Sequence, residues 1–284
     1  MNDAAQLRLA WLVGLLEAEG TFLQPIPSEP RFPIVACQMT DLDVVQQVAS
    51  LFGTTVTRIP REGRRNVFAT RLKGSRAVLL MRDLAPLMSE RRARAITAAL
   101  DAHAAPHRKL DFAAAERIRD LHAQGVSVSR IGRTYGVARA TVRQILERSI
   151  YSAPVVIPWR RPDGDAGLVF DMPRQMSLPE FYWLAGWLEG EGSFLGPPPS
   201  DPHRPRIIAR TQDADVAEEV GRLLAVTPLF SHDARERERG WSPSWRLLRR
   251  GRTAALLMKA LHPLMGSRRR SQIESALAAT SRAP

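Results

Sequence analysis

Acidic residues recur in the same pattern at two places in this chain. The segment LVGLLEAEGTF at 12–22 is repeated as LAGWLEGEGSF at 184–194. Each copy ends a mostly apolar run with Glu-x-Glu-Gly, and the last acids of the two copies are Glu19 and Glu191. Carboxylate oxygens bind divalent cations, which promote phosphodiester hydrolysis by generating a nucleophile and stabilising the leaving oxygen. The repeated acids therefore indicate a hydrolytic site with two related centres.

The apolar runs before these acids have the length and composition of helices, which places the glutamates at two helix C-termini. A helix macrodipole leaves partial negative charge at that end, so carboxylates are unfavourable there unless something compensates them. Gly20 and Gly192 follow directly. We expect them to end the helices in the left-handed backbone conformation, which glycine adopts without steric cost.

Glycines also interrupt the two expected helices. Gly14 and Gly186 lie within the apolar runs, where each costs roughly 1 kcal/mol relative to alanine. A close helix contact would justify this cost, with Gly14 and Ala18 of one helix facing Gly186 and Gly190 of the other. Such packing would bring the two terminal acids together, and a bound cation would remove their repulsion.

The nine-residue segments LVGLLEAEG and LAGWLEGEG resemble the motif that names the LAGLIDADG homing endonuclease family. The resemblance implies that the paired helices form the interface between two αββαββα halves. It also implies that the last acid of each motif, Glu19 or Glu191, binds the catalytic metal, Mg²⁺ or another divalent cation. Both copies have Glu where the family name has Asp, and Glu also supplies carboxylate oxygens.

The repeat continues far beyond the motif. Asp41 and Asp43 recur as Asp213 and Asp215. Farther along, the tripeptide PLM recurs, and the spacing between the copies has grown from 172 to 177 residues. We place the five added residues in a surface hairpin at 235–242, because surface loops tolerate insertions. Repetition over this length indicates two related halves rather than a chance motif.

Apolar period and turn residues predict the same order of elements in both copies. The motif helix is followed by a Pro-rich loop, a strand, a helix capped by Asp41 or Asp213, a hairpin and two further helices. The last helices begin near Ser89 and Ser267. The main predicted strands are 34–38 and 66–73 in the first copy and 206–210 and 244–250 in the second. The fold class is therefore α+β, with two pseudo-symmetric αββαββα halves whose curved sheets are antiparallel.

Alternation along these strands predicts one covered and one open face for each sheet, as is common in antiparallel sheets. In the second copy, Arg206 and Arg210 alternate with the apolar Ile207 and Ala209. Arg and Gln side chains can bond bidentately to guanine and adenine edges in the major groove. The candidate DNA-contacting residues on the open faces are Gln38, Arg71, Lys73, Arg206, Arg210, Arg246 and Arg250.

The composition agrees with a nucleic-acid partner. The 284 residues have a formal net charge of +12, which attracts phosphate and makes binding dependent on salt. The single cysteine, Cys37, excludes an intramolecular disulfide and a zinc cluster. No apolar run approaches the roughly 18 residues of a transmembrane helix, and the N-terminal sequence lacks the order of a signal peptide. We therefore expect a soluble, cytoplasmic protein with no membrane partner.

A different pattern occupies the region at about 110–150, between the copies. A break at Gly125, a cap at Ser127 and a turn at Gly136 predict a helix-turn-helix that resembles the resolvase type. Its second helix, 139–147, would present basic and amide side chains to the major groove. The candidate DNA contacts on it are Arg139, Thr141, Arg143 and Gln144. A purely structural three-helix spacer is the alternative.

These patterns divide the chain into four parts. They are a first LAGLIDADG-like half at 1–105, a helix-turn-helix insertion at 110–150, a linker at 151–178 and a second half at 179–284. A tethered second DNA-binding module would raise the local concentration of the first at its target.

The resemblance also implies a basic residue at the start of the last helix of each half, near the metal site. Arg91 and Arg268 match that position, where the family usually has Lys. Arg stabilises phosphate charge but is a poor proton donor or acceptor. A glutamine near the metal site corresponds to Gln212 in the second half, whereas the first half has Thr40, so the two centres need not be equally active. Helix capping is the alternative role for the two arginines.

Together these features predict a pseudo-symmetric endonuclease for double-stranded DNA that acts as a monomer without an obligate protein partner. In this interpretation Glu19 and Glu191 hold Mg²⁺, while Arg91 and Arg268 stabilise charge on the phosphate. Two alternatives stay open: a regulator that binds a specific DNA sequence without cutting it, and a maturase that assists intron splicing. The acids retained in both motifs argue against the regulator, and a helix-turn-helix favours duplex DNA over RNA.

Overall fold

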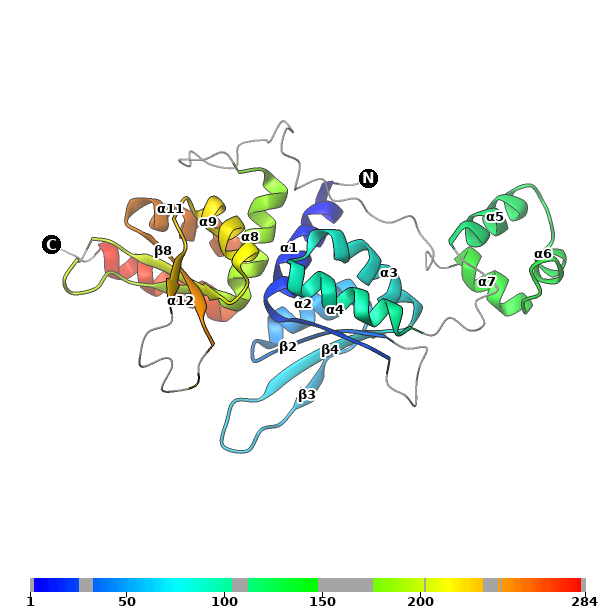
Figure 1. Ribbon diagram of the computed structural model, residues 1–284, viewed down its shortest axis with the longest axis horizontal. Coiled ribbons are helices and arrows are strands. Elements are labelled where there is room, and N and C mark those ends of the chain that lie inside the picture. The colour runs from blue at the N-terminus through cyan, green and yellow to red at the C-terminus, as the bar shows by residue number, and fades with distance from the viewer. Residues whose placement is uncertain are drawn as a thin grey trace.

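Two copies of one mixed helix-and-sheet arrangement lie on either side of two central helices, α1 and α8 (Figure 1). This computed structural model describes residues 3–25, 33–103, 112–147, 176–201, 203–231, 240 and 242–281. We call the described residues up to 103 the first half and those from 176 onward the second half.

The first half follows the expected order of elements. They are α1 (Asp3–Glu19), β1 (Gly20–Leu23), β2 (Ile34–Met39), α2 (Leu42–Phe52), β3 (Thr57–Ile59), β4 (Val67–Lys73), α3 (Ser75–Leu84) and α4 (Glu90–Asp101). A 3-10 turn, Ala85–Leu87, separates α3 from α4, since Pro86 lacks the N–H that a continuing α-helix would use. Ser89 then caps α4 by accepting a hydrogen bond from the backbone N–H of Arg92.

The second half repeats this order. Its elements are α8 (Leu178–Glu191), β5 (Ser193–Leu195), β6 (Arg206–Thr211), α9 (Ala214–Leu224), β7 (Leu229–Ser231), β8 (Ser244–Arg250), α11 (Arg252–Leu261) and α12 (Ser267–Ser281). Helix α8 begins with a capping box formed by Ser177 and Glu180. Most of the hairpin at 235–242, where we place the inserted residues, lies outside the described part of the chain.

Each half contains one four-stranded antiparallel sheet. The strand orders are β1-β2-β4-β3 and β5-β6-β8-β7, so the two sheets have the same topology. In the first sheet, Cys37 and Leu72 point toward α2 and α3 and belong to the core. In the second sheet, Ile207 and Leu247 do the same against α9 and α11. The other face of each sheet carries the alternate residues, among them the exposed Gln38, Arg71 and Lys73 of the first sheet and Arg210 and Arg250 of the second, and we call it the open face.

Helices α1 and α8 touch at their backbones. A Cβ atom added to Gly14 would lie 2.0 Å from the carbonyl oxygen of Trp183, and one added to Gly186 would lie 2.0 Å from that of Trp11. One turn farther along, a Cβ on Gly190 would lie 2.6 Å from the Cβ of Ala18. The expected facing of small residues across the two helices is therefore confirmed.

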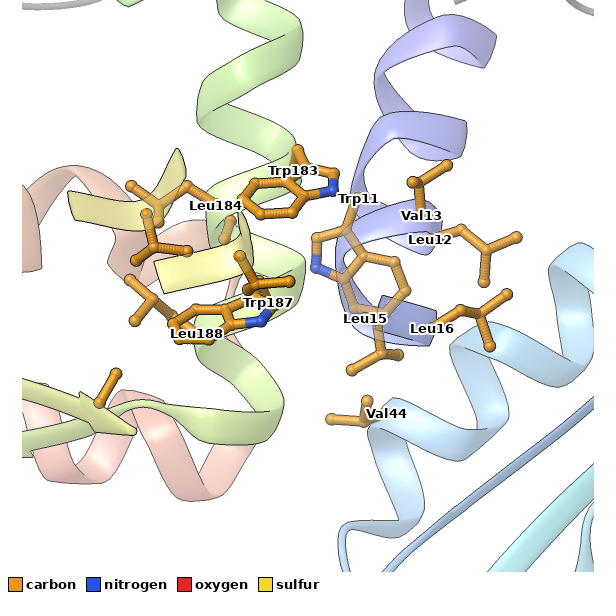
Figure 2. Packing of buried hydrophobic residues seen from close by; sticks show 14 of the residues in the cluster. Trp11, Leu12, Val13, Leu15, Leu16, Val44, Trp183, Leu184, Trp187 and Leu188 are labelled. Atoms are coloured by element: carbon orange, nitrogen blue, oxygen red, sulfur yellow. The ribbon is translucent and has the colours of Figure 1, made fainter. Parts of the chain in front are cut away.

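Large apolar side chains of both helices surround this contact between α1 and α8, which we call the seam. Figure 2 shows the indole rings of Trp11, Trp183 and Trp187 between the two helices, with Leu15 of α1 and Val44 of α2 beside them. All three indoles are buried, and complete burial of a large apolar side chain stabilises a fold by roughly 1.5–3 kcal/mol. The two halves consequently share one continuous hydrophobic core.

The expectation for Gly20 and Gly192 is wrong. Gly20 is the first residue of β1, and Gly192 is extended, with φ −77° and ψ 150°. Neither residue has a positive φ. Glycine is needed here because the chain turns closely past its own helix: an added Cβ would lie 2.3 Å from the carbonyl oxygen of Leu16 or 2.5 Å from that of Leu188.

The capping role expected for two aspartates is also wrong. Asp41 and Asp213 occupy the N-cap positions of α2 and α9, but neither side chain accepts a hydrogen bond from its own helix. Both carboxylates are instead bound to arginines of the opposite half, so a contact between the halves replaces the local cap.

Three helices that lie between the halves in the sequence have a small core of their own. They are α5 (Phe112–Ala123), α6 (Val128–Tyr135) and α7 (Arg139–Glu147). Ser127 caps α6, and Gly136 ends it with φ 60°. Ile118, Ile131 and Ile145 are buried together in this separate cluster. In the described part of the chain, no helix is both long and apolar enough to cross a membrane.

Candidate functional site

The acids Glu19 and Glu191 meet where α1 and α8 end. An added Cβ on Gly190 would lie 3.4 Å from Oε1 of Glu19, so this carboxylate lies over the last turn of the opposite helix. Desolvation, followed by the nearby charge of Glu19, raises the pKa of Glu191 to about 7, although nearby arginines oppose the shift. Desolvation also raises the pKa of Glu19, although three arginines oppose the shift. The two carboxylates are therefore close enough to repel each other.

The donor set fits a magnesium ion. Among the described residues, no side-chain hydrogen bond engages the carboxylate of Glu19 or Glu191, which leaves their oxygens available as ligands. No group of three or more His, Cys, Asp or Glu side chains in the same residues could hold an ion alone. Mg²⁺ is commonly bound by one or two carboxylates together with waters and substrate phosphates. Two glutamates, one of which lines a cavity together with Arg91 and Arg210, are a donor set of this kind.

Two arginines bind the helix C-termini that carry these acids. Arg92 donates to the carbonyl oxygens of Glu17 and Ala18 at 3.1 and 2.9 Å and also to that of Gly20. Arg269 donates to the corresponding carbonyl oxygens at the end of α8, at 3.0 and 2.6 Å. These cations satisfy the unpaired carbonyl groups and offset the macrodipole that makes acids unfavourable at this position.

Sequence reasoning missed Arg92 and Arg269, although the signal was present. Both stand one residue after the predicted pair Arg91 and Arg268 in the matching stretches PLMSERRARA and PLMGSRRRSQ. Burial lowers the pKa of both capping guanidinium groups, because desolvation disfavours the charged form. Their repetition at the same place in both copies could have identified them.

The first acids of the motifs hold the starts of the last helices. Glu17 accepts hydrogen bonds from the backbone N–H and the hydroxyl of Ser89, at 2.8 and 2.7 Å. Glu189 accepts one from the backbone N–H of Gly266, at 2.7 Å. Gly266 has no hydroxyl, and Oε1 of Glu189 is buried without a partner among the described residues. Desolvation raises the pKa of Glu189 to about 7.

The predicted arginines lie at the boundary between the halves. Arg91 of α4 donates through Nε to both carboxylate oxygens of Asp213, at 2.8 and 2.9 Å. Arg268 of α12 donates in the same way to Asp41, at 2.9 and 2.8 Å. The hydrogen bond to Asp213 raises the pKa of Arg91. Each arginine thus joins the last helix of one half to the strand–helix turn of the other.

A surface cavity of about 550 Å³ brings several predicted residues together. Its lining consists of Arg91, Glu191, Arg210, Thr211, Gln212, Asp213, Gly240, Ser242 and Ser244. Arg91 comes from the first half and Glu191 from the second, so both halves build this centre. Thr40 occupies the position in the first half that matches Gln212 and is exposed.

No protein-family model and no curated protein matches the chain. The I-SmaMI LAGLIDADG homing endonuclease bound to cleaved DNA matches 95% of this chain and 88% of its own, with 14% identity and a TM-score of 0.50. The I-LtrWI endonuclease bound to target DNA matches 97% and 90%, with 12% identity and a TM-score of 0.48.

The chain has the LAGLIDADG homing endonuclease fold. Both expected αββαββα halves, their antiparallel sheets and their paired central helices are present in the described residues. The LAGLIDADG fold accounts for the placement of the two motif acids at the end of the helix pair. It does not by itself assign a reaction to them.

All seven predicted sheet residues share the open faces of the LAGLIDADG sheets. In the first sheet, the register places Gln38, Arg71 and Lys73 opposite Ala69, Ala36 and Ile34, and all three are exposed. In the second sheet, arginines stand opposite arginines: Arg206 pairs with Arg250, and Arg210 pairs with Arg246. Like charges directly opposite each other destabilise a sheet. A polyanion on this face would offset their repulsion.

The predicted contacts of the helix-turn-helix lie on α7. Arg139 and Arg143 are exposed there, and Thr141 is half-buried. The side chain of Gln144 lies outside the described part of the structure. Val142 and Ile145 point into the small core, so the polar face of α7 is turned outward. Binding of DNA by this helix stays a prediction.

The raised pKa values make the stability of the metal-free protein depend on pH. Because the pKa of Glu191 rises from 4.5 to about 7 on folding, the folded state binds this proton more tightly than the unfolded state. The contribution of Glu191 to the free energy of unfolding is then fully present below pH 4.5 and is lost as the pH rises through about 7. We expect Glu191→Gln to flatten this decline in the melting temperature, measured with a chelator present. Parallel curves for the variant and the parent would contradict the assignment.

Proposed function

We propose that this protein is a site-specific endonuclease that hydrolyses one phosphodiester bond in each strand of a DNA duplex. The observation that carries the proposal is the meeting of Glu19 and Glu191 at the base of the α1–α8 seam, beside a cavity that also contains Arg91. The arginine-rich open faces supply a binding surface for phosphate and guanine. The structurally similar I-SmaMI is itself described as an endonuclease bound to cleaved DNA.

The residues present divide the chemistry between them. Glu19 and Glu191 would hold Mg²⁺, which supplies a Lewis acid and a nucleophile at neutral pH when it is bound. Arg92 and Arg269 keep the backbone of these acids in place through the carbonyl groups that they bind. The guanidinium groups of Arg91 and Arg268 would stabilise charge on the scissile phosphates, since Arg stays charged and donates in a fixed geometry.

The two centres offer different polar groups to the reaction. Gln212 carries an amide into the cavity of the second half, where it can both donate to a phosphate oxygen and accept from a water molecule. Thr40 offers a single hydroxyl at the matching position. The proposed cuts in the two strands therefore have unequal support from the protein.

Neutral residues on the second open face should weaken DNA binding. We expect Arg246→Gln and Arg250→Gln each to reduce affinity and to lower the salt slope of log K by about 1 for a phosphate contact that is lost. Each change should also raise the melting temperature of the free protein slightly, because it removes a repulsive cross-strand pair. The measurement is a titration of labelled duplex at several salt concentrations.

The matched control for these variants is Lys259→Gln, which removes the same charge from an exposed position on α11. Helix α11 packs against the covered face of the same sheet, so this change should leave the affinity and the salt slope close to those of the parent. Equal losses in all three variants would show that only net charge matters and would argue against a binding role for the open face.

The helix-turn-helix would serve as a second, tethered DNA-binding module. Its exposed Arg139 and Arg143 lie on the outward face of α7, where the recognition helix of such a motif meets the major groove. A tethered module raises the effective concentration of the main binding surface at its target. The proposed complex therefore protects a longer stretch of duplex than the two sheets alone would cover.

The proposed function is tested by selection of cleaved molecules from a randomised duplex library in the presence of Mg²⁺. We expect one enriched, non-palindromic target, cut in both strands, with cutting abolished by a chelator. Enrichment of bound but uncut duplexes over several divalent metals would identify a sequence-specific regulator instead. Preferential binding of structured intron RNA would identify a maturase.

A further inference from the structure

The contacts between the two halves are crossed at both centres. Arg91 of the first half binds Asp213 of the second, and Arg268 of the second half binds Asp41 of the first. Neither aspartate caps its own helix, although each occupies the N-cap position. Both carboxylates thus forgo a local hydrogen bond and bind an arginine that is distant in sequence.

Each arginine lies near the motif acid of the opposite half. Arg91 and Glu191 line the same cavity. Glu19 lies within electrostatic reach of Arg268 and Asp41 in the pseudo-symmetric arrangement. One centre therefore consists of Glu191, Gln212 and Asp213 from the second half with Arg91 from the first. The other centre consists of Glu19, Thr40 and Asp41 from the first half with Arg268 from the second.

The geometry of the pairs holds the arginines without covering them. In both pairs, Nε of the arginine donates to both oxygens of the carboxylate. The side chain of Asp213 is 13% exposed, whereas that of Arg91 is 54% exposed. The second pair has 9% for Asp41 and 34% for Arg268. In each pair, a carboxylate that is less exposed than its partner thus fixes the base of a guanidinium group whose outer part faces the surface.

A second pair of aspartates docks the helices that carry these arginines. Asp215 accepts a hydrogen bond from the backbone N–H of Glu90 at 2.8 Å, and Asp43 accepts one from that of Ser267 at 2.6 Å. These contacts join the same two halves at the same two places but do not touch a guanidinium group. Docking of the helix and orientation of the arginine are therefore separate tasks, assigned to different residues.

We propose that Asp213 and Asp41 are positioning residues, each of which aims the arginine of the opposite half at the phosphate of its own centre. Every cut would then be made by a centre that both halves build. This inference rests on the proposed endonuclease function. It predicts that loss of one aspartate slows the cleavage of one DNA strand only, although both aspartates belong to a single folded unit.

The experiment measures the cleavage of each strand separately, in single turnover with saturating protein and a selected duplex labelled on both strands. We expect Asp213→Asn to slow one strand by roughly tenfold to a hundredfold, the range that a small misplacement of a catalytic group produces. Asp41→Asn should slow the other strand to a similar extent. Gln212→Ala should affect the same strand as Asp213→Asn, since both residues line one cavity.

Asp215→Asn and Asp43→Asn are the matched controls, because they remove the same charge from a contact between the halves, and so weaken it, but leave the arginine pairs intact. We expect them to lower the melting temperature and to change both strand rates equally. If Asp213→Asn and Asp41→Asn also slow both strands equally, they act only in docking and the inference is wrong. Should an Asn variant fail to fold, Asp213→Glu and Asp41→Glu retain the charge and should show partial loss on the same single strand.

A second measurement does not depend on cleavage. Modification of arginine by phenylglyoxal, followed by mass spectrometry, reports how freely each guanidinium group reacts in the full chain. We expect faster labelling of Arg91 in Asp213→Asn and unchanged labelling in Asp215→Asn. Unchanged labelling in both would overturn the inference. A parent protein that cuts no duplex would refute the proposed function, whereas the labelling would still decide whether the aspartates hold the arginines.

Discussion

Glutamine in place of Glu19 or Glu191 is expected to abolish cleavage of both strands while leaving duplex binding close to that of the parent. Both acids lie at one junction and repel each other, so a bound cation would interact with both of them. Loss of one ligand removes several kcal/mol of charge stabilisation in the transition state, which corresponds to about a thousandfold or more in rate. The measurement is single-turnover cleavage beside a binding titration carried out without metal.

The same substitutions should stabilise the metal-free protein at neutral pH. Desolvation raises the pKa of both acids, which means that their ionised forms are unfavourable in the folded state. The control is Glu90→Gln, which removes an acid that is largely exposed at the start of α4. Glu90→Gln should cut both strands at the parent rate. Persistent cutting by the double variant Glu19→Gln, Glu191→Gln would refute the assignment of these acids as the metal ligands.

Alanine in place of Gly14 or Gly186 should cause the largest loss of stability. An alanine would gain roughly 1 kcal/mol in helix propensity. Its methyl group, however, would collide with a backbone carbonyl that no rotamer change can move, since each added Cβ lies 2.0 Å from that oxygen. Overpacking of this kind costs about 3 kcal/mol, or roughly 6–12 °C in melting temperature for a unit of this size. Thermal unfolding measures the effect.

Arg8→Ala provides the comparison on the same helix, because Arg8 is exposed and surface substitutions usually change stability by less than about 0.5 kcal/mol. The glycine variants should also lose cleavage in samples that remain folded, since separation of α1 from α8 separates the two acids. An alanine variant that melts with the parent and cuts at the parent rate would show that the helices do not pack in this way.

Much of the fold could be predicted from the sequence because the same pattern of elements occurs in it twice. Two copies of the motif, with matching Asp41 and Asp213 further on, predict the order of elements. Strand β8 was expected at 244–250 and lies at Ser244–Arg250. Hydrophobic period and Pro or Gly punctuation are local properties, which explains why they predicted elements and the exposed faces well.

Local patterns were less reliable where two reasons could explain the same residue. Gly20 follows a helix, as a left-handed C-cap glycine does, yet it is required by its close approach to Leu16. Asp41 precedes a helix, as a capping residue does, yet it binds Arg268. In both cases the residue type suits either role, and only the position of neighbouring atoms distinguishes them.

The sequence by itself determined the two halves, the glycine seam and the pair of acids at its end. Tertiary structure alone decided which residues serve each centre across the boundary: Arg91 meets Asp213 over a separation of 122 residues, and Arg268 meets Asp41 over 227. Periodicity reports which side of an element is buried, but it carries no information about partners so far apart. Those partners are set by the packing of α1 against α8, which brings the last helix of each half against the strand–helix turn of the other.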